Sequence, residues 1–181
     1  MKKIFYSIIF IFLSISCTSN LDLDLAKQLD IHPILEADIL YFDIYNNNLI
    51  DSNGAFKQQI IDTVDLGVFE NGKIRDSFIK AEIVVAYKNS FNRQFDVEFN
   101  FIDDNNQPVE TGSFLIDAAS GNTDEVSGEH IFIFSKNDNP SFVNFRKIVV
   151  KIEINPTIIP VENKKLHIQS KGIFYSKITI E

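Results

Sequence analysis

The residues that could act in catalysis or bind a metal are few and widely separated in this sequence. The three histidines are His32, His130 and His167, and none has the His-x-x-x-His spacing that places two ligands on one zinc ion. The sequence contains no nucleophile elbow, phosphate-binding loop or dinucleotide-binding motif. We therefore expect the histidines to lie on strand surfaces or at strand ends. We expect neither an enzyme nor a bound cofactor.

Acidic loops form a second group of candidate residues, because calcium prefers oxygen ligands. The candidates are Asp103 with Asp104 and, in a later loop, Asp124 with Glu125. Asp103 does not begin an EF-hand, since Phe114 occupies the twelfth position, where a glutamate is required. Asp and Asn are also the residues of ordinary turns. A calcium site and plain turns both remain open at these positions.

Exposed aromatic and basic side chains are a third group, because they could bind a partner or a ligand. Tyr45 begins a polar loop, and Phe91 with Arg93 lies at a tip between two strongly alternating segments. Phe91 would be a good contact residue if it pointed outward. The alternative is that Phe91 folds back over the open end of the domain. A surface for sugars usually needs exposed aromatic rings, and the chain has no tryptophan.

The first residues have the layout of an export signal. Lys2 and Lys3 precede an apolar run, Ile4 to Phe12, which is interrupted only by Ser7. This run is much shorter than the roughly 20 residues that cross a bilayer as a helix. The chain has one cysteine, Cys17, and therefore no internal disulfide.

The segment from Leu13 to Cys17 reads Leu-Ser-Ile-Ser-Cys and resembles the lipobox of bacterial lipoproteins, here of the Bacteroidetes type. The resemblance implies that cleavage follows Ser16 and that Cys17 carries diacylglycerol. It also implies a location in the cell envelope at the outer membrane, and it leaves open which side of that membrane the domain faces. The membrane would then be reached through lipid on Cys17.

The charge of the chain limits its partners. The formal net charge is −8, and removal of residues 1–16 leaves 15 basic against 25 acidic residues, a net charge of −10. Nucleic acids and anionic lipid surfaces both attract basic faces. We therefore expect no nucleic acid partner and no electrostatic binding to lipid.

Alternation of apolar and polar residues predicts strands along most of the chain after Pro33. The clearest case is Gln94 to Ile102, in which four apolar residues alternate with polar ones. Glu129 to Phe134 is apolar on both sides, which predicts a buried strand. Asn71-Gly72 predicts a tight hairpin turn, and Ser141 to Phe145 is compatible with one helical turn.

Seven to nine strands without a long helix predict an all-β fold, an antiparallel β-sandwich whose topology could be immunoglobulin-like. The expected organisation is a signal peptide over residues 1–16, a tether or first edge strand over 17–32, and one sandwich domain over 33–181. We favour a non-catalytic interaction or assembly module with an envelope protein partner. The alternative is a binder of glycan or calcium that uses the loops at one end of the sandwich, at 45–54, 89–93 and 118–128.

Overall fold

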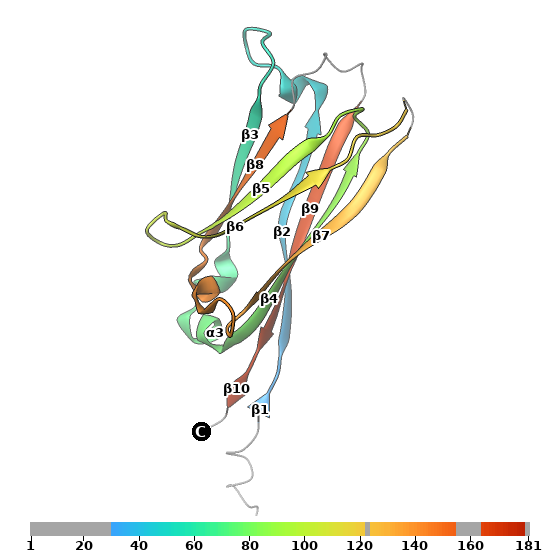
Figure 1. The fold of residues 1–181 in the computed structure, drawn as a ribbon. Helices are drawn as coiled ribbons and strands as arrows, with labels where there is room; N and C mark the ends of the chain where they lie inside the picture. Colours follow the sequence, from blue (N-terminus) through green and yellow to red (C-terminus); the bar gives the residue numbers. More distant parts are fainter. Residues whose placement is uncertain (1–29, 122–123, 155–163, 180–181) are drawn as a thin grey trace, which may run out of the picture. The chain divides into compact units, whose positions relative to one another are not determined.

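The computed structural model describes residues 30–121, 124–154 and 164–179, and Cys17 lies outside this part. Two compact units are present: a large one, His32–Lys177, and a small one that includes residues 30–31 and 178–179. The regular structure of the large unit is mostly antiparallel strands, as the sequence predicts (Figure 1). No helix in the described ranges has the length and apolar character needed to cross a bilayer.

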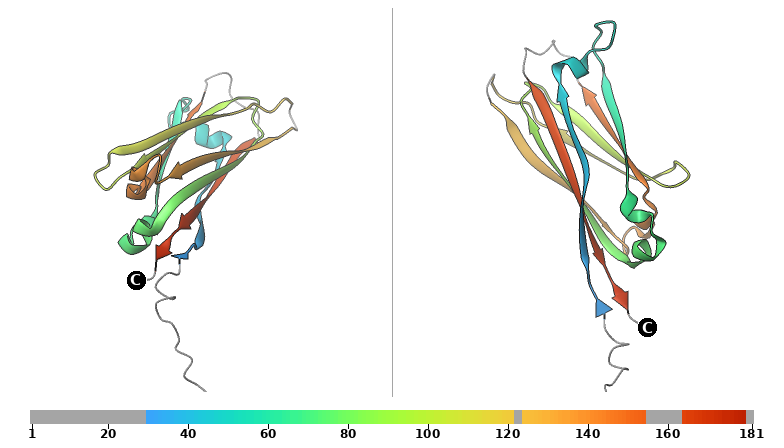
Figure 2. Two further views of the ribbon diagram at one scale, coloured as in Figure 1. Left: turned by 60° about the horizontal axis from the view of Figure 1, so that its bottom comes forward. Right: turned by 180° about the vertical axis from the view of Figure 1, so that it is seen from behind.

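The described residues of the large unit contain eight strands in two four-stranded sheets, one in the order β2-β9-β4-β7 and one in the order β3-β8-β5-β6. The two sheets lie over each other as layers (Figure 2). The strands in chain order are β2 Ile34–Tyr45, β3 Gln59–Asp65, β4 Phe78–Asn89, β5 Phe95–Ile102, β6 Pro108–Ile116, β7 Val126–Ser135, β8 Lys147–Ile154 and β9 Lys165–Ser176.

The strand order follows from folding one long hairpin over on itself. β2 pairs with β9, β3 with β8, β4 with β7 and β5 with β6. The four pairs are therefore nested, with the outermost strands in sequence paired to each other and the innermost two paired to each other. Two further pairings, β4 with β9 and β5 with β8, close this ribbon into two sheets. Eight strands in this order form a jelly roll. The predicted β-sandwich is therefore confirmed, and its strand order differs from the immunoglobulin order.

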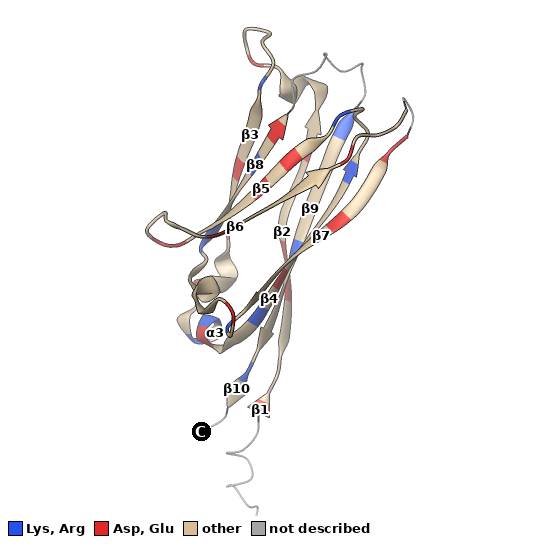
Figure 3. Ribbon diagram, in the orientation of Figure 1, with Lys and Arg blue, Asp and Glu red and all other residues tan. Residues whose placement is uncertain are grey.

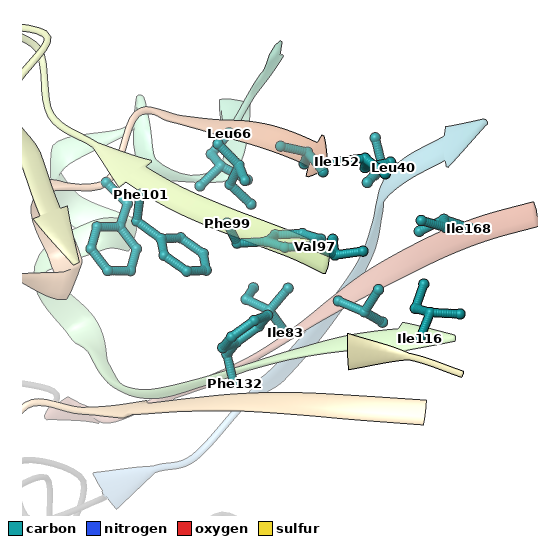
Figure 4. Close-up of a cluster of buried hydrophobic side chains, with 14 of the residues drawn as sticks. Leu40, Leu66, Ile83, Val97, Phe99, Phe101, Ile116, Phe132, Ile152 and Ile168 are labelled. Atoms are coloured by element: carbon teal, nitrogen blue, oxygen red, sulfur yellow. The ribbon is translucent and has the colours of Figure 1, made fainter. Parts of the chain in front are cut away.

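Apolar side chains from both sheets meet between the layers and form one core. Val97, Phe99 and Phe101 on β5 face Ile83 on β4 and Phe132 on β7 (Figure 4). The alternation predicted for β5 is observed, since its four apolar residues from Phe95 to Phe101 are fully buried. Burial of this aromatic and aliphatic core, at about 25 cal/mol per Å² of apolar surface, is the main favourable term in folding.

Short helices connect the strands at a few points. The 3₁₀ turns are η1 Asn46–Leu49, η2 Gly67–Phe69 and η3 Pro140–Asn144, and the helix is α3 Gly72–Ser77. The turn η3 confirms the helical turn that the sequence predicts there. The hairpin predicted at Asn71-Gly72 is wrong, because the Asn71 side chain accepts hydrogen bonds from the backbone N–H groups of Lys73 and Ile74 and caps α3.

The small unit contains a two-stranded ladder. β1, Asp30–Ile31, pairs antiparallel with β10, Ile178–Thr179. The Thr179 hydroxyl also donates a hydrogen bond to the Asp30 carboxylate, with 2.8 Å between Oγ1 and Oδ1. Asp30 and Ile31, near the end of the tether predicted over 17–32, thus pair with β10. Residues 17–29 lie outside the described part.

Candidate interaction surface

Three loops named as a possible ligand site lie at one end of the sandwich, where β2, β4 and β6 end. The Asn89 amide donates hydrogen bonds to the carbonyls of Arg93 and Asp117, at 2.9 and 2.7 Å, and the Ala119 N–H donates to the Phe91 carbonyl. These bonds join the loop after β4 to the loop after β6. The sequence therefore placed these loops correctly at a common end.

The predicted contact residues in these loops are not all accessible. Phe91 is 0% exposed and packs edge-on against Phe95, so it is not an exposed contact, and the alternative that it folds back over the end of the domain is the one observed. The reason is local: the Asn89 carboxamide oxygen accepts the Phe91 N–H and turns the chain back over the core. Arg93 is also buried, with its guanidinium over the Phe56 ring. Tyr45 is half-exposed, and its role as a contact stays a prediction.

The four calcium candidates do not come together. Asp103 and Asp104 follow β5 at one end of the sandwich, whereas Asp124 and Glu125 precede β7 at the other end. The Asp103 carboxylate accepts the N–H groups of Asn105 and Gln107 and thereby shapes its own turn; the bond from Gln107 is the main reason that its pKa lies below the ordinary value.

The other acidic side chains have partners of a different kind. Asp104 pairs with Arg146 at 2.9 Å, Ser120 donates a hydrogen bond to Asp124, and Glu125 lies 3.8 Å from Lys88. Within the described ranges, no three His, Cys, Asp or Glu side chains converge on a point that could hold a metal ion. The geometry thus favours ordinary turns over a calcium site in these loops.

The sheet β2-β9-β4-β7 presents an outer face with polar groups in contact. His167 Nδ1 lies 2.8 Å from Asp43 Oδ1, and the Tyr45 hydroxyl donates to the same carboxylate. The hydrogen bond from His167 is the main cause that lowers the pKa of Asp43, and burial opposes it. Tyr41 packs edge-on against the His167 ring at 5.1 Å. This histidine therefore lies on a strand surface, as expected.

A hollow of about 400 Å³ lies on this outer face. A β-bulge interrupts the pairing of β2 with β9 between Asp38 and Leu40, and the small side chain of Ala86 on β4 leaves space at the middle of the sheet. Asp38, Tyr41, Glu129, Gln169 and Lys171 are among the residues that line the hollow. Tyr41 is 70% exposed beside it. Sequence reasoning missed this site because the bulge and the pairing of β2 with β9 join residues more than 120 positions apart.

The outer edge of β7 is the other notable feature of this sheet. β7 pairs with β4 along one side, and β6, which crosses beneath it, belongs to the other sheet. The predicted burial of this strand is wrong for half of its residues: Phe132 and Phe134 face the core, whereas Ile131 is 44% and Ile133 is 61% exposed. Glu129 is the one charged residue in β7, and Figure 3 shows no basic residue along the strand.

His130 packs on the inner side of β7. Its ring stacks on Phe114 of β6, with 4.6 Å between the ring centres and 9° between the planes, and it packs edge-on against Phe132. Burial lowers the pKa of His130, because the protonated ring would lose its hydration there. The inner side of β7 is thus tightly packed, while its outer side carries two isoleucines in water.

Comparison with known proteins identifies no family. No protein-family model matches the sequence, and no curated protein matches it. Solved structures with a similar fold include a protein of Parabacteroides distasonis described as secreted, with 18% identity, a TM-score of 0.44, and coverage of 64% of this chain and 37% of that chain.

Capsid proteins are also among these structures. The VP2 protein of infectious bursal disease virus has 8% identity, a TM-score of 0.48, and coverage of 80% of this chain and 32% of that chain. A protein of Desmodium yellow mottle tymovirus has 11% identity, a TM-score of 0.32, and coverage of 83% and 89%. The chain spans about a third of the length of the first two structures. At these identities the likeness concerns the fold alone.

Proposed function

We propose that this chain is a lipid-anchored, non-catalytic protein of the cell envelope that binds a protein partner through the outer edge of β7. The anchor would be diacylglycerol on Cys17 in the outer membrane, as the resemblance of Leu13 to Cys17 to a lipobox implies. Each buried CH₂ group contributes about 0.8 kcal/mol to membrane binding, so one acyl chain binds the membrane weakly and two or three acyl chains bind it firmly.

One observation carries the choice of an interaction module: the exposed isoleucines on an unpaired strand edge. A free edge presents a row of backbone N–H and C=O groups that can pair with another chain. Within the described residues, no backbone group of 126–134 bonds to any strand except β4. Ile131 and Ile133 add apolar surface beside this row. The combination favours a partner that extends the sheet.

The charge of the chain agrees with this mode of binding. A net charge of −10 after removal of residues 1–16 disfavours contact with anionic lipid or nucleic acid. Backbone pairing and apolar contact at β7 do not depend on a basic surface. The lipid would therefore supply the membrane affinity, and the β7 edge would supply the partner specificity.

The proposal is tested by purifying the tagged, acylated protein with its partner. Ile133→Lys should abolish co-purification of a stoichiometric partner, because a lysine on an edge strand opposes pairing and apolar contact. Ile61→Lys is the matched control, since Ile61 is 55% exposed on the edge strand β3 of the other sheet. Equal recovery of the partner with both variants would contradict the assignment to β7.

A carbohydrate ligand is the second candidate, and the hollow beside Tyr41 is the observation that favours it. An exposed aromatic ring can pack on the apolar face of a sugar, while Asp38, Glu129 and Gln169 offer hydrogen-bonding groups for its hydroxyls. This site lies on the sheet face, not in the loops at the end of the sandwich.

The second candidate predicts a rise in melting temperature with a bound glycan, which Tyr41→Ala would remove. A thermal-shift screen of envelope polysaccharide fragments measures this. Tyr175→Ala is the control, because Tyr175 lies on the same face but outside the hollow. A shift that survives Tyr41→Ala would place the ligand elsewhere.

A further inference from the structure

We propose that the partner of the β7 edge is a second copy of this chain. The two β7 strands would pair antiparallel about a two-fold axis and join the sheets β2-β9-β4-β7 of both copies into one eight-stranded sheet. This inference rests on the proposed function, since it names the partner of the same edge. Two-fold pairing of one surface with itself is the commonest symmetry of homo-oligomers.

Apart from one charge, Glu129, the β7 edge lacks the features that keep the other edges of the sandwich apart from neighbours. Natural edge strands are guarded by charges, prolines, bulges or short length. β2 has a bulge and carries Asp38 and Asp43, whereas β6 begins with Pro108 and has a register shift opposite that end. β3 is short, with seven residues. β7 has ten residues in unbroken register with β4, and it has no lysine, arginine or proline.

The sequence of β7 matches itself in one register. A two-fold axis through Phe132 places Ile131 of each copy opposite Ile133 of the other and places Glu129 opposite Ser135. Shifting the axis to residue 131 would put Glu129 opposite Ile133, and shifting it to residue 133 would put Ile131 opposite Ser135. Apolar side chains that lie directly opposite each other on two strands stabilise a sheet. The register centred on Phe132 is therefore favoured.

The neighbouring strands extend this match. In the register of β4 with β7, Val84 lies beside Ile131 and Glu82 lies beside Ile133. In the joined sheet, Val84 and Ile131 of one copy and Ile133 of the second copy would lie side by side in one row across the strands. Because the two-fold axis repeats this row, four isoleucines would form an apolar patch with Val84 of each copy at one end of a row and Glu82 at the other.

Charges at the ends of the paired segment are complementary. Lys80 lies beside Ser135 in the register of β4 with β7. Glu129 of one copy would face Ser135 of the second copy and lie two strands, about 10 Å, from its Lys80. Long Glu and Lys side chains can approach each other over this distance. No like charges would face each other between residues 129 and 135.

The paired segments are short and would bury little surface, so we expect a weak dimer that dissociates on dilution. Interfaces below about 1,200 Å² of buried surface are typical of weak or transient complexes. Two copies held in one membrane by their lipids would meet at a much higher effective concentration than in solution.

Cysteine pairs test the register directly. The Cys17→Ser chain contains no other cysteine, so Ile131→Cys and Ile133→Cys can each be introduced alone. Directly opposed residues have Cα atoms about 4.5–5.5 Å apart, within the range of a disulfide. In this register, residue 131 of one copy and residue 131 of the second copy are offset by two positions along the strands. Their Cα atoms therefore lie farther apart than the roughly 7 Å limit for a disulfide.

We expect an equimolar mixture of the two full-length variants, oxidised gently, to form a disulfide-linked heterodimer. Each variant alone, and a mixture with Ile61→Cys, should link at least tenfold less. Sedimentation equilibrium of the Cys17→Ser chain should show a dimer whose dissociation constant rises at least tenfold with Ile133→Lys and not with Ile61→Lys.

A monomer at all concentrations, or equal linking in every combination, would overturn the inference. The proposed function is judged separately. If a different protein still co-purifies with the acylated chain and is lost with Ile133→Lys, the β7 edge has another partner and only the self-pairing is wrong. If neither self-pairing nor such a partner is found, both fail.

Discussion

Replacing Phe101 with alanine is expected to lower the free energy of unfolding by about 3–5 kcal/mol, because it leaves a large cavity between the sheets. Phe101 is fully buried on β5 and contacts rings from the opposite sheet and from the turn before β8. The distances between ring centres are 4.8 Å to Phe134, 4.8 Å to Phe145 and 5.8 Å to Phe132. The loss would thus reach the inner side of β7.

Denaturant unfolding of the Cys17→Ser chain measures this effect. Ile61→Ala serves as the control, since Ile61 is exposed on the outer face of β3 and its truncation should cost no more than about 0.5 kcal/mol. A loss below about 1 kcal/mol for Phe101→Ala would show that the rings around it do not pack as the structure has them.

Replacing Cys17 with alanine is expected to move the protein from the membrane fraction to the soluble fraction, or to leave it unprocessed. The physical reason is the loss of the acyl chains that we propose for Cys17, whose many CH₂ groups would contribute about 0.8 kcal/mol each. Cell fractionation and the mass of the N-terminal peptide measure the two consequences.

Thr18→Ala is the matched control, because it changes the next residue and keeps the thiol. It should remain in the membrane fraction with an acylated Cys17. Membrane retention of Cys17→Ala equal to that of the wild-type protein would show that another part of the chain provides the attachment.

The sequence predicted the strands well because alternation is a local property. In β5, each apolar residue from Phe95 to Phe101 faces the core, as the period of two requires. The same rule gave the all-β sandwich. It could not give the jelly-roll order, because the pairing of β2 with β9 joins residues more than 120 positions apart and leaves no local pattern.

The candidate sites were harder to predict, because exposure depends on position within the sheet. Ile131 and Ile133 make β7 apolar on both sides, a pattern typical of a central strand, yet β7 lies at an edge. Phe91 lies in a polar tip, yet the Asn89 side chain turns it into the core. In both cases a long-range or side-chain contact decided the outcome.

The most direct test of the account is photo-cross-linking in intact cells from position 133, with position 61 as the control. The account predicts a discrete cross-linked product from position 133, either a dimer of the chain or one with another envelope protein, and none from position 61. It also predicts that the yield of the product falls when Cys17 is replaced with alanine, because unanchored copies meet their partner at a lower effective concentration. Products of equal yield from both positions, or no product from position 133 in the acylated protein, would contradict the central claim that a lipid anchor presents the β7 edge to a partner.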